Sequence, residues 1–317
     1  MEILTFSFGA TMPIVLCMAL GLFCRYRGLL EIEMAEKLGT FCFQVLLPGL
    51  IFYNIYNIDF ATEFSPPLML FAVTAHVVLI AVLCLILFPA CKDRAKAAGF
   101  VHLCYRSNYS MIGIALVTNM FGSGGARIAF MLIPVTLILF NVAAVVLFSF
   151  AQVGPGGPPG AQAREICVNV LTNPLIVSSV VATLLSLSPL SLPGVLYDTS
   201  RSLALMAIPF CLIVIGAQIN VQALRDNARV VVWLSCVRLV AVPLVMLPIA
   251  VAFGFRGAEL AALFAVYASP AAAASAIMAQ KYNIYPEIAM QVLTATTIFG
   301  GPTVFVGIAV MRYFQLF

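Results

Sequence analysis

The chain has 317 residues, of which 63% are hydrophobic and only 9% are charged, and its formal net charge is +4. Soluble domains carry about 25% charged residues, so this composition excludes a water-soluble globular protein. A membrane helix needs about 20 mainly apolar residues, so a chain of this length holds about ten spans with their loops and no sizeable soluble domain.

Ten apolar runs, separated by charged residues or by Gly and Pro, predict an all-α membrane protein with ten transmembrane helices. The first run lacks a preceding basic region and is followed by Arg25 and Arg27, so we expect a first span and not a cleaved leader. In chain order the predicted spans are 6–24, 38–56, 67–90, 97–121, 127–150, 166–187, 199–219, 229–253, 259–281 and 288–312.

One low-complexity segment lies near the middle of the chain. Residues 154–160 read Gly-Pro-Gly-Gly-Pro-Pro-Gly, a composition that cannot form a helix and is typical of a linker. We therefore divide the chain into a first half at 1–152, a linker at 153–163 and a second half at 164–317.

The distribution of Lys and Arg predicts the orientation, because cytoplasmic loops are enriched in these residues. With the N-terminus outside, the cytoplasmic loops would hold Arg25, Arg27, Lys37, Lys92, Arg94, Lys96, Arg164, Arg225, Arg229 and Lys281, and the outer loops Arg127, Arg201, Arg256 and Arg312. We therefore expect a multi-pass protein of the cell (plasma or inner) membrane with both termini outside, as an even number of spans requires.

The two halves resemble one another at a nearly constant offset. The corresponding pairs are 11–15 with 172–176, Pro48 with Pro209, 105–107 with 267–269, and 128–129 with 288–289. A repeat with five spans must insert its second copy upside down. Inverted repeats of this kind are typical of secondary transporters, with the substrate bound near the midplane. We therefore predict two inverted five-helix repeats.

The fourth and ninth spans are the least helix-like at their centres. They read Tyr-Arg-Ser-Asn-Tyr-Ser at 105–110 and Tyr-Ala-Ser-Pro at 267–270, and Pro270 removes a backbone donor. Irregular backbone at this depth is tolerated only where it is buried or lines a cavity. We expect both spans to be broken and to cross near the midplane, where half-helix N-termini attract an anion. A simple kink at Pro270 is the alternative.

Arg106 is the residue that we expect to contact the substrate most directly. No Asp or Glu lies in the middle of a span, so a substrate carboxylate would supply the missing counter-ion to the guanidinium; hydration in a cytoplasmic vestibule is the alternative. Arg238, about nine residues into its span, is expected to snorkel toward the cytoplasmic interface. The predicted substrate-binding residues are Asn54, His76, Arg106, Ser107, Asn108, Tyr267, Ser269 and Pro270.

Three segments resemble the auxin efflux carrier family, which includes the plant PIN-type exporters. Asn-Tyr-Ser-Met-Ile-Gly-Ile-Ala-Leu at 108–116 is similar to the family's fourth-helix motif, 281–288 to its loop between helices nine and ten, and 43–55 to its second helix. The resemblance implies a bile-acid-symporter-like fold, with a scaffold domain and a transport domain that contains the crossover. It also implies efflux of small organic anions, such as auxin or dicarboxylates.

Two positions depart from the family pattern. Ala115 stands where the family usually has Pro, and Ser107 stands where PIN-type exporters have the crossover Pro. The break in the fourth span is therefore less directly indicated than the break in the ninth.

The coupling ion is left open by the sequence. His76 and His102 are the groups that titrate near neutrality, although a His in a span is also an ordinary hydrogen-bonded residue. Sodium is the alternative, held by carbonyls at the broken helices together with Ser and Asn oxygens. No cofactor, metal site or catalytic grouping is indicated, so we do not expect an enzyme.

The functional prediction is a secondary active transporter that moves a small organic anion, a carboxylate, dicarboxylate or auxin-like molecule, by alternating access. A non-transporting receptor or sensor with the same fold, or a channel, remains the alternative. The expected partners are the substrate and the lipid bilayer, without nucleic acid, and a homodimer is compatible with such a chain.

Overall fold

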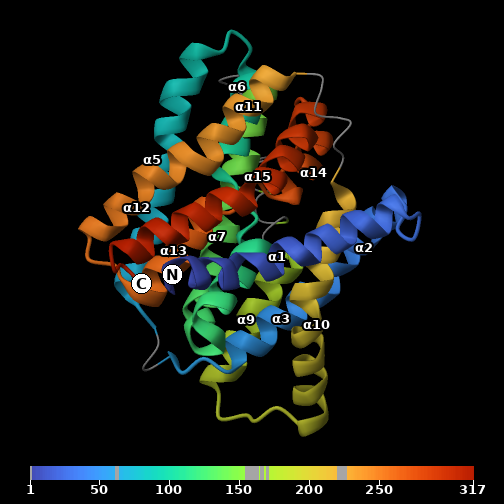
Figure 1. Ribbon diagram of the computed structural model, residues 1–317, viewed down its shortest axis with the longest axis vertical. Coiled ribbons are helices and arrows are strands. Elements are labelled where there is room, and N and C mark those ends of the chain that lie inside the picture. Colours follow the sequence, from blue (N-terminus) through green and yellow to red (C-terminus); the bar gives the residue numbers. More distant parts are fainter. Residues whose placement is uncertain (1, 61–63, 154–163, 165–167, 169–170, 220–226) are drawn as a thin grey trace.

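The computed structural model describes residues 2–60, 64–153, 164, 168, 171–219 and 227–317 (Figure 1). Within these residues the structure is helical apart from turns, short extended segments and one isolated antiparallel bridge, between Ser107 and Ala271. The all-α prediction is therefore confirmed for the described chain. The predicted linker at 154–163 lies outside the described residues.

The helices follow the predicted apolar runs. In chain order they are α1 (Glu2–Tyr26), α2 (Ile32–Phe41), η1 (Cys42–Leu46), α3 (Leu47–Tyr56), α5 (Pro66–Ala90), α6 (Arg94–Tyr105), η2 (Tyr109–Gly113), α7 (Ile114–Val153), α9 (Pro174–Leu187), α10 (Gly194–Gln218), α11 (Ala228–Cys236), η4 (Val237–Ala241), α12 (Val242–Ala252), α13 (Gly257–Ala268), α14 (Ala273–Lys281) and α15 (Pro286–Tyr313). The η segments are π-helical turns that continue the neighbouring helices.

Seven helical stretches of the described chain are long and apolar enough to cross a membrane. They are Glu2–Tyr26, Ile32–Tyr56, Pro66–Ala90, Gly124–Phe148, Gly194–Gln218, Ala228–Ala252 and Pro286–Tyr313. Three shorter apolar helices are Tyr109–Gly122, Pro174–Leu187 and Gly257–Ala268. Gly122 has φ +65° and ψ −164°, so it separates the two parts of α7 at the place where the fourth and fifth spans were predicted to divide.

One group of helices consists of α1, α2, α3, α9 and α10, which pack against one another (Figure 1). The crossing of α1 and α10 depends on two glycines. A Cβ atom at Gly21 would collide with the carbonyl of Ile213, and a Cβ atom at Gly216 with the carbonyl of Met18. Small residues let membrane helices approach closely in this way, so this interface is tight and reciprocal.

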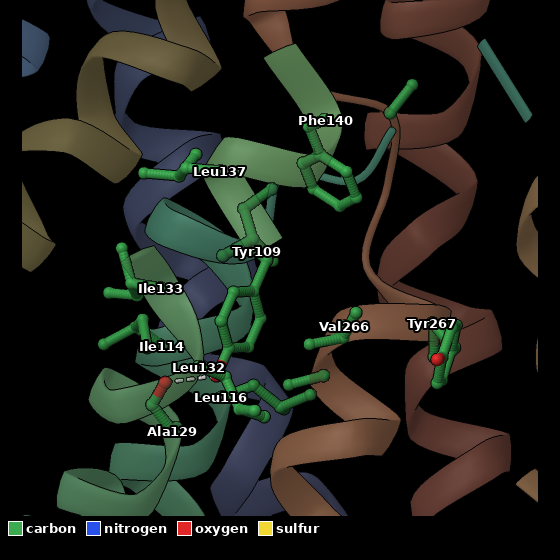
Figure 2. Packing of buried hydrophobic residues seen from close by; sticks show 14 of the residues in the cluster. Tyr109, Ile114, Leu116, Ala129, Leu132, Ile133, Leu137, Phe140, Val266 and Tyr267 are labelled. Carbon is green, nitrogen blue, oxygen red and sulfur yellow. Dashed lines mark hydrogen bonds between the residues drawn. The ribbon is translucent and has the colours of Figure 1, made fainter. Parts of the chain in front are cut away.

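The second group consists of α5, α6, α7, α11 to α15 and the η2 and η4 turns. Figure 2 shows part of its core, in which the buried ring of Tyr109 lies among aliphatic side chains of α7 and faces Val266 of α13. The Tyr109 hydroxyl donates a hydrogen bond of 2.5 Å to the carbonyl of Ala129. The two groups meet where α1 packs on α15 and α7.

Candidate functional site

The first half of the site is an interruption between α6 and η2. Asp93 caps the start of α6 by accepting a hydrogen bond from the N–H of Ala95, and the helix ends at Tyr105. The backbone is then extended at Arg106, with φ −81° and ψ 111°. Helical backbone resumes at Tyr109, so the predicted break in the fourth span is present although no Pro occupies it.

The second half is an interruption between α13 and α14. Helix α13 ends at Ala268, and Ser269 and Ala272 are both extended, with ψ angles of 150° and 142°. Pro270 has no N–H to continue the helical ladder. Its ring also fills the space beside Gly300 of α15, where a Cβ atom would collide with it. The predicted break in the ninth span is therefore present as well.

The two interruptions lie side by side and run antiparallel. The N–H of Asn108 donates to the carbonyl of Pro270 at 2.8 Å, and the N–H of Ala272 donates to the carbonyl of Arg106 at 3.3 Å. The N–H of Ala271 donates to Thr296 Oγ1 of α15 at 3.1 Å. Buried backbone N–H and C=O groups need hydrogen-bond partners, and the two interruptions supply partners to each other. We call this pair of interruptions the crossover.

Arg106 lies buried at the crossover, with 5% of its surface exposed. Its Nη2 donates to Asn141 Oδ1 of α7 at 3.1 Å, whereas the buried Nη1 has no hydrogen-bond partner. In the part of the chain that the structure describes, no carboxylate pairs with this guanidinium. A buried arginine is normally paired or fully hydrogen-bonded, so Arg106 retains binding capacity for an anion.

Further unpartnered polar atoms follow Arg106. Ser107 Oγ and Asn108 Nδ2 are buried without hydrogen-bond partners, as is Thr297 Oγ1 on α15. Buried side-chain polar atoms rarely stay unpaired in folded proteins. The crossover and its surroundings therefore carry both donors and acceptors that a polar ligand can use.

His76 and Tyr267 form a second buried cluster next to the crossover. Their rings stack at 4.9 Å between centroids, and the Tyr267 hydroxyl lies 3.2 Å from His76 Nδ1. His76 Nδ1 donates to the carbonyl of Ala72 at 2.7 Å. His76 Nε2 is buried without a partner, so this imidazole retains one position for a proton or a hydrogen bond.

Two of the predicted site residues use their side chains within their own helices. Asn54, on α3, donates from Nδ2 to the carbonyl of Leu50 at 2.8 Å, and its described hydrogen bond does not involve the crossover. Ser269 donates from Oγ to the carbonyl of Ala265 at 2.5 Å. Ser269 nevertheless lies within the crossover, whereas Asn54 belongs to the first helix group.

A pocket separates α1 from the crossover. Thr11 and Met18 of α1 form one side, and Ile112, Pro270 and Thr297 form the other. The cavity volume is only about 20 Å³, enough for about one water molecule, and the lining is mainly apolar. None of these lining residues except Pro270 was predicted from the sequence. The small residues around Thr297 on α15 were a usable signal, because they let Pro270 and Val15 pack closely against that helix face.

The expected position of Arg238 at the cytoplasmic interface is wrong. Instead of snorkelling to the cytoplasmic interface, it is fully buried, and its guanidinium donates to the carbonyls of Ser269 and Cys104 at 3.0 and 3.1 Å. Carbonyl groups at the ends of two helices attract a cation, and this attraction holds the side chain inside the bundle.

The loops that precede α6 and α15 are joined outside the spans. The Tyr285 hydroxyl donates to Asp93 Oδ2 at 2.5 Å, and this hydrogen bond, ahead of those from the Ala95 and Lys96 backbone, holds the pKa of Asp93 below its usual value. The pKa of Tyr285 is raised by the same bond. A depressed carboxylate pKa stabilises the fold above the unfolded pKa, and this contribution is lost as the pH falls through the folded value.

Comparison with known proteins places these features in context. The sequence model of a family described as "Membrane transport protein" matches residues 6–308. A protein of Methanothermobacter thermautotrophicus described as an "Uncharacterized transporter" is 21% identical over 304 residues, which cover 92% of this chain and 94% of that relative.

Proposed function

The chain belongs to the membrane transport protein family, and on this basis we propose that it is a secondary transporter that exports a small organic anion by alternating access. The observation that carries the proposal is Arg106, whose Nη1 is buried without a partner beside the crossover. A carboxylate would accept hydrogen bonds from the guanidinium and neutralise its charge. Asn108 Nδ2, also unpartnered, is a further donor for the same ligand.

The lining of the pocket next to the crossover supports a substrate with an apolar body, which would enter only after helix movement has widened the pocket. Ile112, Met18 and Pro270 contribute apolar surface, and Thr297 contributes a hydroxyl. Ligand sites commonly combine an apolar lining with a few placed polar groups. The proposed substrate class is therefore a carboxylate or dicarboxylate with a hydrophobic portion, and the direction follows from the resemblance to efflux carriers.

Helix packing supports the proposed inverted repeat. Helix α1 packs on α10, α9 packs on α3, and α3 and α10 pack on each other. In the proposed repeat, α1 corresponds to α9 and α3 corresponds to α10. Exchanging these partners turns the contact of α1 with α10 into the contact of α9 with α3, and leaves the contact between α3 and α10 unchanged. The proposed repeats are 1–152 and 164–317, and two pseudo-symmetric halves supply the two states that alternating access requires.

Orientation has a direct test. We propose ten spans with both termini outside the cell membrane, as the loop charges indicate. Labelling of a single introduced cysteine, or a reporter fused at the same point, should report the cytoplasm after Arg229 and the exterior after Phe317. A cytoplasmic location after Phe317 would contradict the ten-span topology and the inverted repeat with it.

The transport function is tested in two steps on the purified protein. A thermal-shift screen of small carboxylates identifies the ligand, because a ligand at 100 times its Kd adds about 2.7 kcal/mol of stability. Counterflow of that labelled ligand into proteoliposomes is then expected for a carrier. Binding without flux would identify a sensor instead, and flux without counterflow would identify a channel.

A further inference from the structure

Arg238 is the most completely bonded buried side chain at the crossover. It lies on the π-helical turn η4 and is fully buried. Its Nε donates to the carbonyl of Ser269 at 3.0 Å, and its Nη2 donates to the same carbonyl at 2.9 Å and to that of Val266 at 3.0 Å. Two of the three guanidinium nitrogens, Nε and Nη2, therefore bind the C-terminal end of α13.

The remaining nitrogen reaches the other half-helix. Arg238 Nη1 donates to the carbonyl of Cys104 at 3.1 Å and approaches that of Tyr105 at 3.4 Å. These two residues end α6. The last carbonyls of a helix have no intrahelical partner, and each helix C-terminus carries about half a negative charge. Two such ends therefore offer about one unit of negative charge to one guanidinium.

Arg238 thus differs from Arg106 although both are buried at the crossover. Arg106 keeps one nitrogen without a partner, whereas each guanidinium nitrogen of Arg238 donates to a carbonyl. Its charge is balanced by backbone dipoles that belong to the crossover itself. Arg238 is accordingly not available to a substrate anion, and its role has to be found in the helices that it joins.

We propose that Arg238 is a resident cation that fixes the ends of α6 and α13 to each other, in the place where a coupling metal ion would otherwise bind. Hard cations bind clusters of carbonyl oxygens. Here the guanidinium covers those oxygens, and its charge repels a second cation at short range. Arg238 is a positioning residue: it sets the geometry in which Arg106 and Asn108 face the ligand. Only this last effect rests on the proposed transport function.

Chemical rescue tests the proposal without any substrate. Arg238→Ala removes the cation, and its melting temperature is expected to fall by roughly 5–10 °C, since a broken buried charge network is strongly destabilising. Guanidinium ion, used far below denaturing concentrations, should restore much of this loss, and equimolar urea should not. Urea has a similar planar shape but no charge, so the pair separates a missing cation from a missing volume.

Arg25 provides a matched control. It also caps a helix C-terminus, donating from Nη1 to the carbonyl of Ile219 at 2.6 Å and to that of Ala217 at 3.3 Å, but that helix is α10, outside the crossover. Arg25→Ala is expected to show no rescue by guanidinium, because its site is not enclosed. Arg238→Lys, which keeps the charge but cannot reach both helix ends, should lie between wild type and Arg238→Ala.

The wild-type protein supplies a measurement that does not depend on a variant folding. Its melting temperature is expected to be equal in sodium chloride and choline chloride at the same concentration. A sodium-specific increase in wild type, equal rescue by urea and guanidinium, or an Arg238→Ala protein as stable as wild type would overturn the proposal.

Ligand binding distinguishes this proposal from the proposed function. If guanidinium rescues Arg238→Ala while no carboxylate binds the wild type, the proposal for Arg238 is supported and the proposed anion transport is contradicted. If a carboxylate binds the wild type through Arg106 but guanidinium does not rescue Arg238→Ala, the proposed anion transport is supported and the proposal for Arg238 is contradicted. With both correct, guanidinium should also restore the anion affinity of Arg238→Ala.

Discussion

Replacing Arg106 with glutamine is expected to weaken anion binding by about 10–100-fold, because a hydrogen bond to a charged group contributes about 1.5–3 kcal/mol. Arg106 follows the 12-residue helix α6, which at 1.5 Å per residue places it about 18 Å from the helix start, near the centre of a hydrocarbon core about 30 Å thick. Its Nη1 has no partner there. The loss should appear in ligand-induced thermal shifts and in transport.

The lysine variant tests which property of the side chain matters. Arg106→Lys keeps the charge but loses the planar fork, so its anion affinity should lie between wild type and Arg106→Gln. Without ligand, Arg106→Gln should be at least as stable as wild type, since an uncompensated charge at this depth costs about 2.5–3.5 kcal/mol. Arg201→Gln, on an exposed arginine of α10, is the control. Normal binding by Arg106→Gln would show that Arg106 is not a ligand.

Replacing Pro270 with alanine is expected to reduce transport by roughly tenfold or more while expression stays near wild type. Alanine restores a backbone N–H and removes a helix-breaking cost of about 3 kcal/mol, so α13 can extend toward α14. Extension would draw the Pro270 carbonyl away from the N–H of Asn108, which it accepts at 2.8 Å. The initial rate of substrate uptake into proteoliposomes measures the effect.

A second proline provides the comparison. Pro302 lies inside α15 without interrupting it, so Pro302→Ala changes a helix-interior proline that is not at the crossover. Its transport should stay within about twofold of wild type, since Pro302 is exposed and surface substitutions usually change stability by about 0.5 kcal/mol or less. If Pro270→Ala transports at the wild-type rate, Pro270 merely bends the chain, as the alternative interpretation of the sequence held.

The two breaks show how far local sequence signals reach. Pro270 predicted the interruption of the ninth span because a proline lacks the backbone N–H and clashes with the preceding helical turn. Both effects are local in the sequence. The interruption at Ser107 has no proline, and its backbone pairs instead with Pro270 and Ala271, more than 160 residues away. The polar residues around Arg106 indicated an irregular segment, but the segment that pairs with it came from the other half of the chain.

Arg238 illustrates what could not be predicted. Its position within an apolar span suggested an escape route to water, because the sequence offered no carboxylate partner. Its actual partners are the backbone carbonyls of Cys104 and Ser269. Every residue has a backbone carbonyl, so the amino-acid composition does not show which carbonyls a buried arginine will bind. Asn141, which holds Arg106, and Thr296, which satisfies the N–H of Ala271, were missed for a related reason: a polar residue on a span does not indicate which helix it faces.

The two buried arginines at the crossover have an electrical consequence. Helix dipoles carry no net charge, because each negative C-terminus moves together with its positive N-terminus. The two buried guanidinium groups, of Arg106 and Arg238, therefore give the empty crossover a formal charge of +2. A bound dicarboxylate makes the crossover neutral. Moving one elementary charge through a membrane potential of 100 mV is worth about 2.3 kcal/mol. A potential that is negative inside would therefore pull the empty site back to the cytoplasmic side and leave the loaded site free to move outward, so voltage alone would favour export.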